Sequence, residues 1–166
     1  MFDLRTTDEI TNILNKFLEP FEATAFAGTD FSYFYIDSSI EYTFVVSERM
    51  NRLFMEYAKS IGLKTKIDIF LISFLHELGH HETLDEIDDD DEEYSRLIKE
   101  NLNSDNDDNC KIYFALPDEK MATEWAINYI NNNTDVIKNL WDQLQPAIMK
   151  FYAVNNIYWF FIKFLI

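Results

Sequence analysis

The chain has 166 residues, of which 48% are apolar and 16% aromatic, which suits one compact domain and disfavours a disordered chain. Its formal net charge of −16 comes without any cluster of Lys or Arg, so nucleic-acid binding through phosphate contacts is disfavoured and a basic protein partner is favoured. The single cysteine, Cys110, excludes an intrachain disulfide and indicates a reducing compartment.

The two ends of the chain bear on its location. The first five residues, Met1 to Arg5, contain no apolar core of a signal peptide, and no stretch reaches the roughly 18 apolar residues that span a bilayer. We therefore expect a cytoplasmic protein without stable membrane insertion. The run Ile157–Ile166 comes closest, but it is short and Lys163 interrupts it. We expect it to be a core helix or strand, with membrane-surface contact or partner docking as alternatives.

In the first third of the chain, a helix is predicted from Thr6 to Pro20, because apolar residues recur there at helical spacing. A short strand is predicted over Phe21–Ala27. Two segments rich in aromatic and β-branched residues, Phe31–Ile36 and Tyr42–Val46, flank the turn Asp37-Ser38-Ser39 and predict an antiparallel pair.

Two helices are predicted next. The first covers Glu48–Ile61, with Gly62 as its C-cap. The second starts near Ile67 and runs to His80, and its broad apolar face places it at the centre of the domain.

The composition changes over Glu82–Asn109, where eight of the nine residues from Asp85 to Glu93 are acidic. We interpret this segment as a long, solvated insertion containing one short helix. An EF-hand calcium loop is disfavoured, because Cys110 stands where such a loop needs glycine.

A strand is predicted over Lys111–Leu116 and a helix over Asp118–Ile130, with Pro117 at its start. A last helix, Asp135–Val154, is expected to kink near Pro146. The expected fold is therefore a single α+β domain, mostly helical, with a small antiparallel sheet.

The segment His76-Glu77-Leu78-Gly79-His80 carries the clearest chemical signal. Residues four apart lie one turn apart on the same helix face, so His76 and His80 can reach one zinc ion. Glu77 lies beside them and suits the role of general base toward a metal-bound water. Gly79 lowers helix propensity by about 1 kcal/mol relative to alanine, which a close backbone approach would explain.

A third zinc ligand is expected downstream. Glu119 is favoured, because it opens a predicted helix whose small residues, Ala122 and Ala126, allow close packing against the histidine helix. Thr123 lies on the same face and could hydrogen-bond a ligand histidine. Glu124 is the alternative ligand. Each part of the site has a structural alternative: the histidine motif could be a helix with exposed polar residues near its end, and Glu119 a carboxylate stabilised by the dipole at a helix N-terminus.

Two further groups are uncertain from the pattern alone. His81 is more consistent with a cation at the helix C-terminus than with a ligand, since it points about 100° away from His80. Phenol donors to a transition state could come from four tyrosines: Tyr33, Tyr35, Tyr42 and Tyr113.

The two segments together resemble the ImmA/IrrE-type metallopeptidases, a family with His-Glu-x-Gly-His followed by Glu-x-x-Ala-Asn-x-Phe-Ala. Thr123 stands here where that family has Asn or Asp, and Trp125 replaces its Phe. The resemblance implies a zincin-like fold of the gluzincin type with two His ligands and one Glu ligand. It also implies site-specific cleavage of protein substrates, often transcriptional repressors encoded in phages and mobile elements.

The predicted function is therefore that of a zinc-dependent endopeptidase acting on a protein or peptide, such as a repressor. The intact Glu77 favours turnover. The alternative is a catalytically silent, metal-bearing acidic interaction or decoy protein of the kind that phages encode, which the surplus of acidic residues favours. A structural helical domain with a chance motif is the third interpretation.

Overall fold

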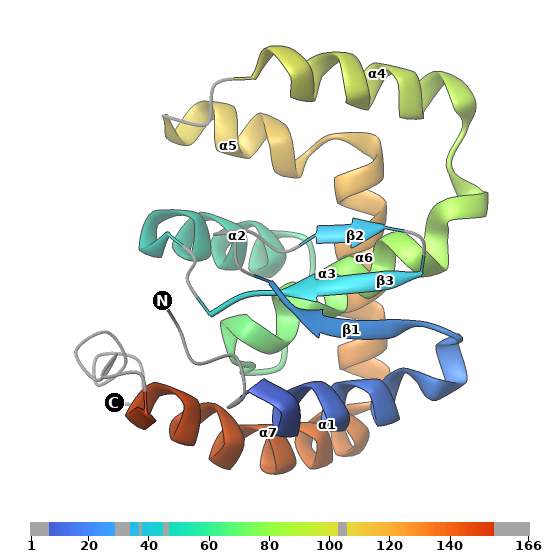
Figure 1. Ribbon diagram of the computed structural model, residues 1–166. Coiled ribbons are helices and arrows are strands. Elements are labelled where there is room, and N and C mark those ends of the chain that lie inside the picture. Colours follow the sequence, from blue (N-terminus) through green and yellow to red (C-terminus); the bar gives the residue numbers. More distant parts are fainter. Residues whose placement is uncertain (1–6, 29–33, 37, 45–46, 103–105, 155–166) are drawn as a thin grey trace.

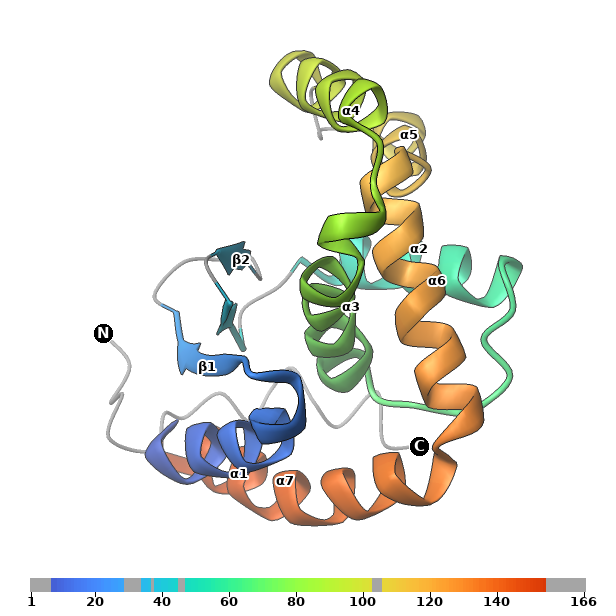
Figure 2. The same cartoon turned by 90° about the vertical axis from the view of Figure 1, so that its right-hand side faces the viewer.

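The computed structural model describes residues 7–28, 34–36, 38–44, 47–102 and 106–154, and Figure 1 shows their arrangement. Helices make up most of it, with one small sheet, so the expected α+β class is confirmed. The helices α1 and α7 lie at one end of the molecule, α4 and α5 at the other, and the sheet, α2 and α3 between them. Helix α6 connects the two ends (Figure 2).

The sheet has three strands: β1 (Thr24–Ala27), β2 (Phe34–Ile36) and β3 (Ser39–Tyr42), in the order β1-β3-β2. Strands β2 and β3 pair in antiparallel fashion, as expected. The prediction of a purely antiparallel sheet is nevertheless wrong, because β1 runs parallel to β3. Strand β3, not β2, lies next to β1. The chain reverses direction between β1 and β2 and again between β2 and β3, so β3 runs in the same direction as β1.

The boundaries of β3 also differ from those predicted. The strand begins at Ser39, directly after Ser38, whose φ of 60° provides the left-handed turn conformation, and it ends at Tyr42. Ile40 and Tyr42 are buried and face the core. The strand therefore alternates as expected when one face is buried, but it does so over Ser39–Tyr42 rather than over the predicted range.

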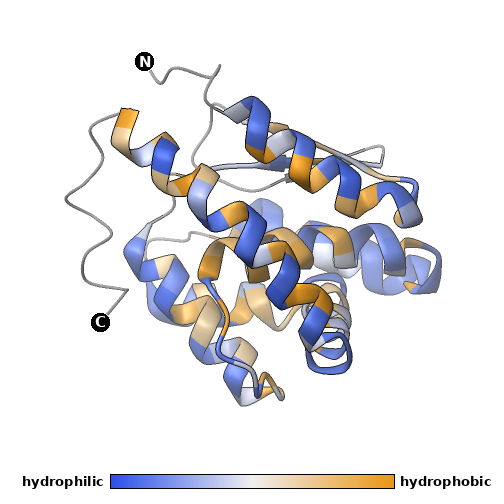
Figure 3. Cartoon of the chain, turned by 90° about the horizontal axis from the view of Figure 1, so that it is seen from below, coloured by the Kyte–Doolittle hydropathy of each residue, from blue (hydrophilic) through white to orange (hydrophobic). Residues whose placement is uncertain are grey.

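Helices α1 (Asp8–Leu18) and α7 (Thr134–Val154) pack against each other at the lower end. Both are amphipathic, as their alternating colours in Figure 3 show. Pro146 lies inside α7, as the sequence indicated. Helix α2 (Glu48–Ser60) ends with Gly62 at φ 123°, and the N–H of Leu63 donates to the carbonyl of Ala58 at 3.0 Å, which confirms the predicted glycine stop.

Helix α3 (Ile69–Thr83) is the central helix. Asp68 caps it by accepting the N–H of Phe70, and nine of its residues are buried. Its most extensive contact is with α6 (Pro117–Asn132). A Cβ on Gly79 would overlap the backbone carbonyl of Ala122, so the close approach expected at this glycine is made by helix α6.

The acidic stretch is helical rather than irregular. After the short 3-10 helix η3 (Leu84–Glu86), α4 covers Asp89–Asn101, with Asp88 as its N-cap and four acidic residues in its first turn. Acidic side chains stabilise a helix N-terminus by opposing its dipole, and Arg96 pairs with Glu93 and Glu100 farther along. The short helix expected around Tyr94 to Leu102 is therefore present, but it begins earlier, at Asp89, and so includes part of the acidic run, whose side chains are exposed.

The strand predicted over Lys111–Leu116 is wrong. This segment is the second half of α5 (Asp107–Phe114), which Asn106 caps by accepting the N–H of Asn109 at 2.8 Å. Cys110 and Phe114, four residues apart, form its buried side. Among the described residues, no helix is long and apolar enough to cross a bilayer. The run Ile157–Ile166 lies outside the described residues.

Candidate metal centre

Three side chains from the two closely packed helices converge on one point. His76 and His80 come from α3 and Glu119 from the first turn of α6. One possible ligand atom from each lies within 4.8 Å of the other two, which is close enough for all three to hold one metal ion. The sequence prediction of these residues as one group is therefore confirmed, and the close contact at Gly79 brings the helices together.

The hydrogen bonds of Thr123 determine the orientation of His76. The Thr123 hydroxyl donates to the backbone carbonyl of Glu119 at 2.7 Å, so it can only accept from His76 Nδ1, which lies 3.0 Å away. In its neutral form, His76 then turns the lone pair of Nε2 toward Glu119. The expected support of a ligand histidine by Thr123 is thus present.

The contact between His76 Nε2 and Glu119 indicates whether a cation fits between them. His76 Nε2 lies 3.0 Å from Glu119 Oε2, and both atoms carry lone pairs. Two acceptors at hydrogen-bond distance repel each other unless a proton or a metal ion lies between them. The donor set, two imidazole nitrogens and one carboxylate oxygen, is one that divalent transition metals prefer.

Glu119 is a buried anion. Its side chain is 4% exposed, and although burial opposes ionisation, the adjacent imidazoles of His76 and His80 hold its pKa well below the usual range. His80 Nε2 lies 3.7 Å from Glu119 Oε1. Burial lowers the pKa of His80, but the adjacent Glu119 carboxylate outweighs this and raises it. The site is therefore built to hold positive charge.

Glu77 lies beside this group without belonging to it. The residue is half-buried and lines the same cavity as His80 and Glu119. Burial raises the pKa of its carboxyl, while the neighbouring histidines lower it. A carboxylate that adjoins the ligands and faces open space can take a proton from a bound molecule, which is the position predicted for the general base.

The cavity has a volume of about 320 Å³ and opens between α3, η3, α4, α5 and α6. The acidic segment thus forms part of its wall. Besides Glu77, His80 and Glu119, the cavity is lined by residues of mixed chemistry: Thr83, Leu84, Ile87, Glu92, Lys99, Tyr113, Asp118 and Met121.

The alternative ligand, Glu124, is not part of the group. Its side chain is 48% exposed and lies 3.7 Å from the ammonium of Lys120 on the surface of α6. His81 also points elsewhere, since its Nε2 lies 2.8 Å from the carbonyl oxygen of Phe21. Glu119 rather than Glu124 is therefore the third residue of the cluster.

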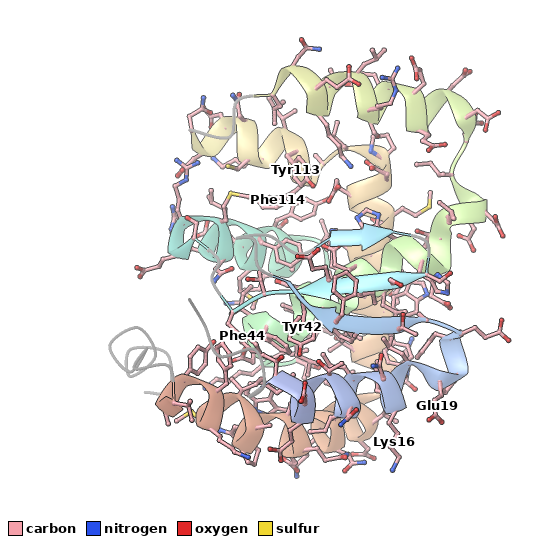
Figure 4. The ribbon with its side chains drawn as sticks, viewed as in Figure 1. Lys16, Glu19, Tyr42, Phe44, Tyr113 and Phe114 are labelled. Carbon is pink, nitrogen blue, oxygen red and sulfur yellow. The ribbon has the colours of Figure 1, made fainter. Side chains whose placement is uncertain are left out.

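Of the candidate phenol donors, Tyr113 lies at the site. It lines the cavity, and burial together with the nearby Glu119 charge raises the pKa of its phenol. Tyr42 instead bonds Thr11 Oγ1 at 2.7 Å in the core, and Figure 4 shows it well apart from Tyr113. The side chains of Tyr33 and Tyr35 lie outside the described residues.

Lys99 was missed by the sequence reasoning. This residue of α4 places its Nζ 2.6 Å from Glu119 Oε1, pairs with Asp118 and lies 5.4 Å from the centre of the Tyr113 ring. Lys99 follows Ser95 by four residues and shares its face, but only the structure shows that this face is buried. The interpretation of this segment as a solvated insertion concealed that face.

Comparisons with protein-family models, with curated proteins and with solved structures found no match.

Proposed function

We propose that this protein is a zinc-dependent endopeptidase of zincin-like architecture, with His76, His80 and Glu119 as ligands and Glu77 as general base. The observation that supports it most is the convergence of the three possible ligands beside one cavity, whose wall includes His80, Glu119 and Glu77. A purely structural zinc site is usually closed by four protein ligands, whereas a catalytic one has three and an open position.

Each residue has a separate task. Thr123 fixes the His76 ring, so that Nε2 faces the ion, and the buried Glu119 carboxylate balances its charge. Zinc, when bound, lowers the pKa of a coordinated water to about 7 and polarises a peptide carbonyl. Glu77, on the cavity wall, would be the general base that accepts a proton from the attacking water and returns it to the leaving amine. Tyr113 lines the same cavity and would donate its phenol proton to the substrate.

The substrate that fits best is a basic protein or peptide. The net charge of −16 favours encounter with positive surfaces at low ionic strength, and the acidic segment lies at the edge of the cavity. The resemblance to ImmA/IrrE-type peptidases suggests a transcriptional repressor as the first substrate to examine.

One observation favours the alternative of a metal-bearing acidic interaction protein without turnover. Every acidic side chain from Asp85 to Glu93 is exposed, which would suit binding of a basic partner without cleavage. The two functions differ in whether they need Glu77, because a general base is required for turnover and not for holding the ion.

The substitution Glu77→Gln separates these functions, since it keeps the shape of the side chain and removes the proton acceptor. We expect the variant to retain zinc and to cleave a library of basic peptides about 10²–10⁴-fold more slowly than the wild type, as measured by mass spectrometry. Glu124→Gln is the matched control, because Glu124 is exposed and outside the site; it should cleave at the wild-type rate. Equal cleavage by both variants would contradict the enzyme proposal.

A further inference from the structure

Lys99 joins the acidic helix α4 to the candidate metal centre. Its side chain crosses from α4 to the first turn of α6, where the ammonium contacts Asp118 and Glu119. Among the described residues, no other lysine or arginine lines the cavity. Because Glu119 is a proposed metal ligand, its contact with Lys99 affects how its carboxylate can bind the ion.

The two oxygens of the Glu119 carboxylate have different partners. Oε2 lies 3.0 Å from His76 Nε2, whereas Oε1 lies 2.6 Å from Lys99 Nζ. Oε1 also lies 3.7 Å from His80 Nε2, which is beyond hydrogen-bond distance. A hydrogen bond between charged groups at this distance is among the strongest that a carboxylate forms in proteins, so Oε1 is held by the lysine.

A carboxylate without such a restraint can bind one ion through both oxygens, and the second oxygen then fills a coordination position that a water would need. Asp118 strengthens the restraint, because it contacts the same ammonium and keeps it beside Glu119. The ring of Tyr113 covers the ammonium at 5.4 Å, which also favours a cation at this place.

We propose that Lys99 is a positioning residue that holds Glu119 Oε1, an inference that rests on the proposed function. Glu119 then offers the ion only its other oxygen, Oε2, and one coordination position stays open for water. The acidic helix α4 is then part of the site rather than an appendage, because it supplies the cation that sets how Glu119 binds. Lys99 itself does not coordinate the ion.

The test is the visible absorption of the protein loaded with cobalt(II) in place of zinc, since four-coordinate cobalt absorbs more strongly than five-coordinate cobalt. In Lys99→Met, both oxygens of Glu119 should bind, and the absorption per bound cobalt should fall. Lys99→Arg keeps the charge and the hydrogen bond and should restore it. Lys120→Met, which removes an exposed lysine of α6, is the matched control and should match the wild type.

Activity gives a second readout: with saturating metal, we expect Lys99→Met to cleave about 10–100-fold more slowly. An unchanged cobalt spectrum in Lys99→Met would overturn this proposal and leave the proposed function standing. A wild type that binds no cobalt would overturn the proposed function, and this inference with it.

Infrared difference spectra of the wild type, recorded as the metal is added, need no variant and cover the case in which Lys99→Met does not fold. A wide separation of the two carboxylate stretching bands indicates binding through one oxygen and supports the proposal. A narrow separation indicates binding through both and would overturn it.

Discussion

At the scale of single residues, Thr123 decides which nitrogen of His76 faces Glu119. Its hydroxyl proton is used by the carbonyl of Glu119, and only its lone pairs remain for His76 Nδ1. This arrangement could be anticipated from the sequence, because Thr123 follows Glu119 by four residues on one helix face. The contact with Lys99 could not, since it joins residues from helices whose relative placement no local pattern specifies.

The substitution Thr123→Val keeps the shape of this side chain and removes the acceptor for His76. We expect zinc affinity to fall about 10–100-fold, because the imidazole loses its orientation, as measured by competition with a chelator. Thr83→Val is the control: Thr83 is also buried and bonds a carbonyl of its own helix, that of Gly79, without touching the metal group. If both variants bound zinc like the wild type, the orienting role of Thr123 would be wrong.

At the scale of the elements, sequence patterns located the long helices well. Apolar residues at helical spacing identified α1, α2, α3, α6 and α7 to within a few residues. They failed at α5, because the β-branched and aromatic run Ile112-Tyr113-Phe114 is typical of a strand. Cys110 and Phe114 have helical spacing, but only the structure shows that both are buried. The parallel pairing of β1 with β3 is a non-local contact that strand patterns do not encode.

The contact between α3 and α6 at Gly79 makes the strongest prediction at this scale. Alanine has the higher helix propensity by about 1 kcal/mol, yet its methyl group would overlap the backbone of Ala122 and push the helices apart. We expect Gly79→Ala to lower the free energy of unfolding by about 1–3 kcal/mol in urea titrations and to weaken zinc binding.

Gly62→Ala provides the comparison. At φ 123°, with no atoms within 4 Å of a new Cβ, this glycine should also lower the free energy of unfolding, by about 1–2 kcal/mol, but leave zinc affinity unchanged. A Gly79→Ala variant as stable as the wild type, with full zinc affinity, would show that the helices do not meet as closely as described.

At the scale of the whole molecule, the site lies where separate parts of the chain meet. The possible ligands come from α3 and α6, and helices α4 and α5 form part of the wall of the cavity beside them. The central helix could be predicted from the sequence, and so could the grouping of His76, His80 and Glu119. The place of helix α4 in the cavity wall could not, because its strongly acidic composition is equally typical of solvated segments.

The central claim is that His76, His80 and Glu119 hold one ion together, and elemental analysis of the purified, zinc-reconstituted and dialysed protein tests it most directly. The wild type and Glu124→Ala should retain about one zinc per chain, as expected of a single three-residue site, whereas His76→Ala and Glu119→Ala should retain almost none. A wild type without zinc, or a Glu119→Ala variant that keeps its zinc while Glu124→Ala loses it, would contradict the account.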